Sequence, residues 1–408
     1  MKKVILVISL ASAIVLVSTC AKREEGRCRL RYHQVDISES RIYYACQDQF
    51  RLSEKPAQLK DLPKKISNRV NYFHAKIAGR EIPLIIDRGR KSKLYLDTDA
   101  DGCLSDEKGF TSKTVKRRLF GPVDYYRFGP ISVKFEQAAE KFAQQIYVFT
   151  RDSYMRHLIL CPAHYRKGKV LLDQNIYEVR VVDGNFDGKY GRILSLPIEK
   201  IWRPGCDSFA IDLNHNGKLD FNYYLHSEIM PLGRMVRVGN SYYSINIAEG
   251  GTFLELNKIQ PECGTLDLGN TNVKLKLWSD AAQQYISDLK SNGPIPAGRY
   301  KALFIELSQI DSERNAWTFT SYRDTGALYD FEINKNETTS FEIGPPFQIK
   351  VTPRQGRDTV YIRFKLEGQA SEQYRSDVKR NGIRVSPPLF KIIDEGGIVV
   401  DSGWFEYG

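Results

Sequence analysis

The sequence is 408 residues long and lacks the short motifs that identify the common catalytic classes. It contains no HExxH, no GxSxG and no Walker loop, so zinc peptidases, α/β-hydrolases and P-loop proteins receive no support. No CxxC pair occurs, which leaves thioredoxin-like and zinc-ribbon proteins without support as well. The motifs therefore predict no catalytic residue, and they do not identify an enzyme.

Long apolar runs are also lacking, apart from one at the N-terminus. The chain begins with MKK, continues with the apolar run VILVISLASAIVLV and then reads STC. A short basic start, an apolar run and small residues are typical of a secretory signal. Later stretches are too polar to span a bilayer, so a multi-pass membrane protein is not predicted. We expect residues 1–20 to form a signal peptide and the mature chain to be exported.

The end of this signal resembles a bacterial lipobox. Val17, Ser18 and Thr19 precede Cys20, and the resemblance implies that Cys20 carries a lipid and becomes the new N-terminus. The protein would then be lipid-anchored to a membrane of the bacterial cell envelope. Ordinary cleavage after Ala21, which would give a secreted protein, is the alternative.

Methionine is scarce, whereas tyrosine and phenylalanine are abundant, with 4, 23 and 20 residues respectively. Aromatic side chains favour strands, and short apolar segments recur between Gly-rich or charged turns. The sequence predicts a mainly β, multidomain protein, with a strand-rich N-terminal module followed by immunoglobulin-like sandwich modules. Residues 135–149 (FEQAAEKFAQQIYVF) are the exception, because their apolar spacing predicts a helix.

Changes in composition divide the mature chain into four parts. We expect an N-terminal arm, a β-rich domain that contains the Asp/Asn-Gly loops described below, a β-sandwich module and a C-terminal β-sandwich module. Their boundaries are placed at residues 21–65, 66–264, 265–345 and 346–408.

The cysteine count favours disulfides. Seven cysteines occur, and lipidation of Cys20 would leave an even number in an exported chain. The disulfide candidates are Cys28, Cys46, Cys103, Cys161, Cys206 and Cys263. Sequential pairing is expected, with Cys28 and Cys46 closing the shortest loop. The alternative is that some of these residues are buried thiols.

The formal net charge is +11, which indicates an affinity for anionic partners. An exported protein is not expected to meet nucleic acid. Anionic lipid headgroups, polysaccharide or another envelope protein are the partners that this charge favours. A solvated basic face without any partner is the alternative.

Three stretches place Asp or Asn on alternate positions before a glycine. Loop 1 (residues 97–108) reads DTDADGCLSDEK, loop 2 (183–194) reads DGNFDGKYGRIL and loop 3 (212–223) reads DLNHNGKLDFNY. Each follows an apolar run that predicts a strand. Calcium prefers six to eight oxygen ligands, and side chains at positions one, three and five can surround one ion. Glycine at position six permits the sharp turn between them.

The candidate metal ligands are oxygen atoms of these loops. Those of loop 1 are Asp97, Asp99, Asp101, the carbonyl of Cys103, Ser105 and, as closing ligands, Asp106 or Glu107. Those of loop 2 are Asp183, Asn185 and Asp187. Those of loop 3 are Asp212, Asn214, Asn216, the carbonyl of Lys218 and Asp220. We expect loop 1 to be the strongest site and loop 2 the weakest.

Each loop resembles the EF-hand calcium loop over about twelve residues. The resemblance implies coordination by the alternate side chains and by the carbonyl at position seven. Position twelve departs from it, because Lys108, Leu194 and Tyr223 replace the bidentate glutamate. Asp207 and Glu228 are candidates to close loop 3 from a neighbouring segment. We therefore expect weak, structural calcium sites; the alternative is that Asx-turns alone shape these loops.

The combination is similar to uncharacterised secreted bacterial lipoproteins that carry EF-hand-like DxNxDG loops in a β-rich scaffold. It implies a non-enzymatic, lipid-anchored envelope or surface protein that acts in binding or adhesion, with calcium setting the loop geometry. The alternative function is a secreted hydrolase that acts on polysaccharide or peptide. Converging acids in a cleft would favour the hydrolase, and packed sandwiches with metal loops at their edges would favour the binding protein.

Overall fold

The structure is a computed structural model that describes most of the chain. The described residues are 24–35, 47–77, 79–115, 125–137, 140–150, 154–196, 205–220, 227–248, 250–269, 272–286, 294–322, 325–357, 359–374 and 378–405. Among them there is no α-helix, and the only helical turn is the 3-10 turn η2 (Gly326–Tyr329). The prediction of a mainly β protein is confirmed. The predicted signal peptide and Cys20 lie outside the described residues.

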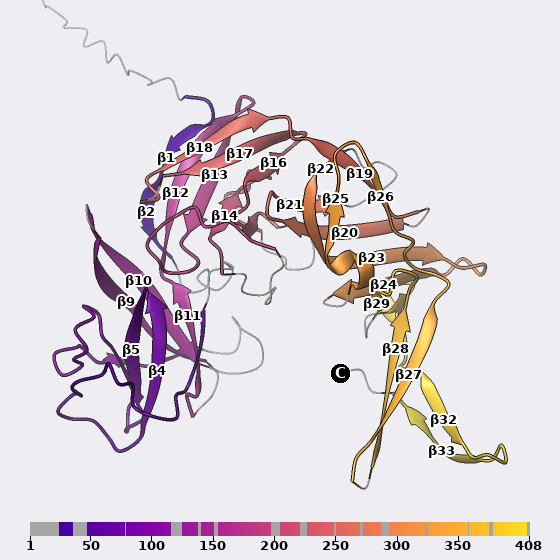
Figure 1. The fold of residues 1–408 in the computed structure, drawn as a ribbon, viewed down its shortest axis with the longest axis horizontal. Helices are drawn as coiled ribbons and strands as arrows, with labels where there is room; N and C mark the ends of the chain where they lie inside the picture. The colour runs from indigo at the N-terminus through magenta and orange to yellow at the C-terminus, as the bar shows by residue number, and fades with distance from the viewer. Residues whose placement is uncertain are drawn as a thin grey trace, which may run out of the picture.

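Strands follow one another in several separate sheets, and Figure 1 shows these sheets arranged along an arch. Within the described part of the chain, the pairings between strands are antiparallel except for β19 (Cys263–Asp267) with β26 (Thr338–Ser340). No helix of the described residues has the length and hydropathy of a membrane span. The predicted domain boundaries stay a prediction, but the hydrophobic clusters show which strands share a core.

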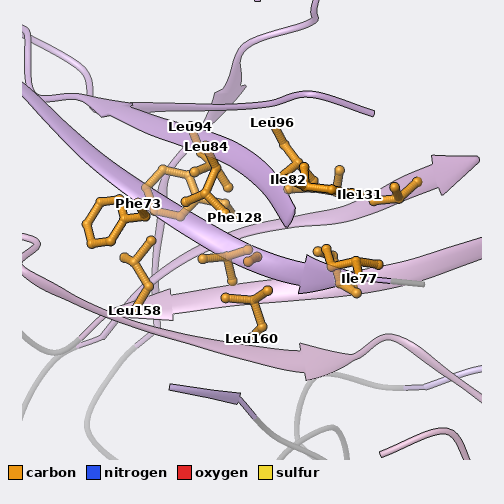
Figure 2. Close-up of a cluster of buried hydrophobic side chains, with 14 of the residues drawn as sticks. Phe73, Ile77, Ile82, Leu84, Leu94, Leu96, Phe128, Ile131, Leu158 and Leu160 are labelled. Carbon is orange, nitrogen blue, oxygen red and sulfur yellow. The ribbon is translucent and has the colours of Figure 1, made fainter. Parts of the chain in front are cut away.

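The first pair of sheets lies at one end of the arch, opposite the C-terminal strands (Figure 1). One sheet has the order β4-β5-β6-β7 and the other the order β3-β11-β10-β9-β8. Their strands are β3 (Gln47–Phe50), β4 (Val70–Ile77), β5 (Arg80–Asp87), β6 (Lys93–Leu96), β7 (Phe110–Thr111), β8 (Lys113–Val115), β9 (Tyr125–Gln137), β10 (Glu140–Thr150) and β11 (His157–Pro162). Phe73 and Leu84 of one sheet meet Phe128 and Leu160 of the other in a buried core (Figure 2). Burial of this apolar surface holds the two sheets together.

The helix predicted over residues 135–149 is wrong. The described residues of this stretch, 135–137 and 140–149, belong to β9 and β10, which pair with each other in an antiparallel register. Strand β10 also pairs with β11 on its other side, so its backbone groups are satisfied within the sheet. Ile146, Val148 and Phe149 are fully buried there. The apolar run IYVF suits a buried strand, and this tertiary burial outweighs the helix-forming residues before it.

The second pair of sheets recruits strands from the N-terminal arm. Its sheets have the orders β1-β18-β17-β16 and β15-β14-β13-β12-β2. The strands are β1 (Arg27–Arg29), β2 (Arg31–Gln34), β12 (His164–Leu172), β13 (Asn175–Val182), β14 (Ser208–Ile211), β15 (Ile229–Pro231), β16 (Met235–Val238), β17 (Ser241–Ile247) and β18 (Phe253–Ile259). Strand β1 pairs with β18 and β2 with β12, and Leu30 is buried in the shared core. Residues far apart in the sequence thus complete this pair.

The third pair of sheets buries several aromatic residues in its core. A large sheet runs β21-β20-β23-β24-β30-β31, with β25 beside β23, and a small sheet has the order β22-β19-β26. The further strands are β20 (Asn272–Ser279), β21 (Gln283–Ile286), β22 (Ile295–Pro296), β23 (Gly298–Ile310), β24 (Ala316–Tyr322), β25 (Phe331–Ile333), β30 (Lys379–Arg380) and β31 (Ile383–Arg384). Tyr300 and Leu275 lie in its core, and Trp278 is fully buried at its border with the second pair.

The C-terminal strands form two narrow ribbons at the far end of the arch (Figure 1). The strands are β27 (Gln348–Gln355), β28 (Val360–Glu367), β29 (Gln373–Tyr374), β32 (Leu389–Ile393) and β33 (Val399–Trp404). Every residue of β27 is exposed, and Ile349 and Trp404 are among the exposed apolar side chains. Among the described residues, the buried members of the hydrophobic clusters end at Tyr374.

The described cysteines form no disulfide with one another. The expected pairs Cys103 with Cys161 and Cys206 with Cys263 are therefore wrong. Cys161 is buried in a cluster with Tyr147 and Phe149, and Cys206 is buried in the cluster around Trp278. Cys28 lies in the core of the second pair, and its expected partner Cys46 lies outside the described residues.

Candidate metal centre

All three Asp/Asn-Gly loops begin directly after a strand. Loop 1 follows β6, loop 2 follows β13 and loop 3 follows β14. The predicted strands before the loops are thus confirmed, and they place the first aspartate of each loop at a buried strand end. Asp97 and Asp183 are each 1% exposed and Asp212 is 6% exposed.

The loops share one backbone conformation. The residues at positions four and six have positive φ angles in every loop, and a conformation of this kind is sterically open mainly to glycine. At position four the residues are Ala100 (63°), Phe186 (57°) and His215 (58°), and at position six they are Gly102 (85°), Gly188 (81°) and Gly217 (74°). The alternating sequence pattern therefore specifies a repeated three-dimensional unit.

Hydrogen bonds inside the loops repeat as well. The aspartate at position one accepts from the backbone N–H of the glycine at position six, at 2.9, 2.8 and 3.0 Å in loops 1, 2 and 3. The side chain at position five accepts from the N–H at position seven, at 2.6, 2.8 and 2.7 Å. These bonds turn the alternate side chains toward one side of each loop, as the Asx-turn alternative also requires.

An acidic side chain from outside the first seven positions closes each loop. In loop 1 it is Glu107, which accepts from the backbone N–H and the hydroxyl of Thr98. In loop 2 it is Asp207, whose Oδ1 accepts from the N–H of Gly184 at 2.9 Å. In all three loops, the closing carboxylate accepts a hydrogen bond from the backbone N–H of the residue at position two. The shared contact defines a closing carboxylate, and it selects Glu107 over Asp106 in loop 1.

Loop 3 is closed by Glu228. One of its oxygens accepts from the N–H of Leu213 at 2.7 Å, and the other accepts from the N–H of Asp220 at 2.8 Å. Glu228 was one of two residues expected to reach loop 3. The other, Asp207, closes loop 2 instead, because it lies just before β14, beside the end of β13.

Loop 1 brings three carboxylates together. Oxygen atoms of Asp97, Asp99 and Asp101 lie within 4.8 Å of one another, which is a separation that ligands of one metal ion can have. Asp97 is buried, and burial raises the pKa of its carboxyl. Asp99 and Asp101 are exposed. These three residues could hold a metal ion.

The remaining candidates of loop 1 differ in how close they stay to the triad. Glu107 is turned into the loop by Thr98, and burial raises the pKa of its carboxyl. Ser105 instead hydrogen bonds to the carboxylate of Asp61. Asp106 is exposed. Of these three candidates, Glu107 is the one that is hydrogen bonded to the start of loop 1.

Loop 2 is the most deeply buried of the three. Asp183 accepts through Oδ2 from the N–H of Gly188 at 2.8 Å, and the N–H of Phe186 also stabilises its carboxylate, but its buried Oδ1 has no hydrogen-bond partner of good geometry among the described residues. Burial raises the pKa of the Asp183 carboxyl well above its usual range, and the nearby charges of Asp207 and Asp187 raise it further. Burial also raises the pKa of Asp207, to about 6. Asn185 donates from Nδ2 to Asp187 at 2.6 Å.

Loop 3 is the most exposed. Asn214 accepts from the N–H of Asn216 at 3.0 Å and donates from Nδ2 to Asp220 at 2.9 Å. Only Asp212 of its candidate ligands is buried, and Lys218 is exposed. Its last three positions lie outside the described residues. The described part therefore brings fewer charged oxygens together than loop 1 does.

No family model, curated protein or solved structure matches the chain. The arrangement of the three loops therefore carries the functional argument.

Proposed function

We propose that the protein is an exported, non-enzymatic calcium-binding protein of the bacterial cell envelope, anchored by lipid at Cys20, that acts in binding or adhesion. The observation that supports calcium is the cluster of Asp97, Asp99 and Asp101 in loop 1. Its donors are all oxygen, the donor type that calcium prefers and that softer metals do not select. Cys103 would contribute its carbonyl oxygen.

The calcium ions would have a structural role. A bound ion offsets the repulsion between neighbouring carboxylates and holds a loop in one conformation. The paired antiparallel sheets support immunoglobulin-like modules as the scaffold that these ions stiffen. The net charge of +11 supports an anionic polysaccharide or another envelope protein as the partner.

Calcium titration of the full chain tests the metal. We expect heat of binding and a rise in the midpoint of thermal unfolding at roughly micromolar to millimolar calcium, and a return to the starting midpoint with chelator. Magnesium at the same concentration is the control, because its strict octahedral geometry fits these loops less well. A midpoint that does not change with calcium would remove the ion from the proposal.

Mass spectrometry of the mature N-terminus tests the anchor. An acylated Cys20 is expected in protein isolated from its native membrane. A mature chain that begins at Lys22 with no lipid would instead show ordinary secretion.

A further inference from the structure

We propose that loop 2, closed by Asp207, is a buried calcium site that holds the joint between the second and third pairs of sheets. The joint is the hydrophobic cluster of Leu194, Cys206, Trp278 and Leu303. This inference rests on the proposed calcium binding, and it assigns the tightest site to the loop whose sequence matches the calcium pattern least well.

A buried oxygen of loop 2, Oδ1 of Asp183, receives no hydrogen bond from the described part of the chain. Asp183 is 1% exposed, and its Oδ1 makes no hydrogen bond with any described residue. A buried polar atom of this kind is costly unless a partner compensates it. An aspartate occupies position one of every loop, and in loop 1 this residue, Asp97, lies close to the carboxylates of Asp99 and Asp101. A cation beside Asp183 would supply the missing partner.

Negative charge is concentrated around loop 2. Asp183 and Asp207 are both almost fully buried, and Asp187 lies near them. Among the described residues, neither Asp183 nor Asp207 forms an ion pair. Two adjacent buried carboxylates without a cation repel each other strongly, since water no longer screens them. A divalent ion removes this repulsion, and the ligands would be Asp183, Asn185, Asp187 and the carbonyl of Lys189.

Asp207 acts by positioning the loop. Its Oδ1 accepts from the N–H of Gly184, and its Oδ2 accepts from the N–H groups of Gly191 and Arg192 at 2.7 and 2.8 Å. Both ends of loop 2 are therefore tied to one carboxylate. Gly184 allows this approach, because a Cβ at that position would lie 1.9 Å from the carbonyl oxygen of Cys206.

Packing and backbone hydrogen bonds connect loop 2 to the joint. Position twelve of loop 2 is Leu194, which packs in the joint beside Cys206 of the second pair and Trp278 of the third. The backbone of Asp207 accepts from the N–H of Leu232 at 2.7 Å, and Leu232 accepts from the N–H of Leu194 at 2.7 Å. Leu194, at the end of loop 2, is thus linked through the backbone of Leu232 to Asp207, the residue that closes the loop. An ion that orders loop 2 would therefore also order the joint.

Natural cysteines provide the readout. Cys206 lies in the joint, Cys103 lies at position seven of loop 1, and Cys263 lies in β19, outside both loops. The full chain is treated with an alkylating reagent under native conditions, in chelator, calcium or magnesium, and peptide mapping gives the modification rate at each cysteine. At a calcium concentration about ten times the dissociation constant, we expect modification of Cys206 to slow about ten-fold. Cys263 should show no change.

Two matched variants assign the effect. Asp187→Asn keeps the shape of loop 2 and removes a ligand charge, so it should abolish calcium protection of Cys206 and leave protection of Cys103. Asp99→Asn in loop 1 should do the reverse. If Asp187→Asn does not fold, Asp99→Asn still separates the two loops, because protection of Cys206 should persist when loop 1 has lost a ligand and should disappear if it arises from loop 1.

The outcomes separate this inference from the proposed function. Protection of Cys103 without protection of Cys206 would overturn the inference and leave calcium binding at loop 1 intact. Protection of Cys206 that persists in Asp187→Asn would also overturn it, because the protection would then arise elsewhere. Protection of neither cysteine, together with no heat of binding, would overturn both.

Discussion

Loops 1 and 2 have the same local pattern and different surroundings. Both follow a buried strand end, and both have positive φ at positions four and six. Loop 1 is closed by Glu107 from its own sequence and keeps Asp99 exposed. Loop 2 is buried and is closed by Asp207, which directly precedes the next strand, β14. A local pattern thus sets the path of the loop, and distant residues set its dielectric environment and so the strength with which it attracts a cation.

Removal of the closing carboxylate of loop 2 should have the largest effect on the free energy of unfolding. Asp207→Ala leaves the N–H groups of Gly184, Gly191 and Arg192 without an acceptor, and we expect the free energy of unfolding to fall by about 3 kcal/mol or more. The matched control is Asp106→Ala at the exposed end of loop 1, with an expected change within about 0.5 kcal/mol. Denaturant unfolding measures both, and equal effects would contradict the comparison.

The contact made by the residue at position eight should make the free energy of unfolding depend on pH near loop 2 but not near loop 1. This position holds Tyr190 in loop 2, whose hydroxyl contacts buried His164 at 3.1 Å, and apolar Leu104 in loop 1. Burial lowers the pKa of His164 to about 4, assisted by the charge of Arg166, although the carbonyl of Gln145 acts in the opposite direction.

Between its unfolded and folded pKa values, His164 binds a proton more readily in the unfolded chain. Its contribution to stability is therefore complete above about pH 6.5 and is lost as the pH falls to about 4. The stability advantage of the wild type over His164→Gln should shrink by about 3 kcal/mol across this range. Denaturant unfolding of both proteins measures the difference, and a difference independent of pH would mean that His164 is not held neutral.

The closing residue of loop 1 should matter less than that of loop 2. Glu107→Ala removes an acceptor from Thr98 at a partly exposed site, so we expect a loss of about 1–2 kcal/mol. Glu107→Gln is the control, because it retains an acceptor oxygen. A loss as large as that of Asp207→Ala would show that burial does not distinguish the two loops.

The smallest effect on the metal-free protein is expected at Asp99. Its side chain is exposed, so Asp99→Ala should change the free energy of unfolding by about 0.5 kcal/mol or less without calcium. The same variant should reduce the heat of calcium binding by the share that loop 1 contributes. Unchanged binding of calcium would exclude Asp99 as a ligand.

The local features of the loops could be predicted from sequence because they depend on neighbouring residues. Alternate Asp and Asn side chains before glycine indicate the turn, and the runs before them indicate strands. The residue that closes loop 2 could not be predicted from neighbouring residues, because Asp207 reaches Gly184 only through the pairing of β13 with β14. Its sequence signal was an acid directly before a strand, which is common and therefore weak.

The sequence alone determined the mainly β class and the three turning loops, because strand preference and glycine φ angles are properties of short segments. Tertiary structure decided the rest. It paired β9 with β10 where the sequence predicts a helix, drew β1 and β2 into distant sheets, left the described cysteines without disulfides to one another and buried Asp183 beside Asp207. These outcomes depend on contacts between residues far apart in the chain, where burial and charge act through space.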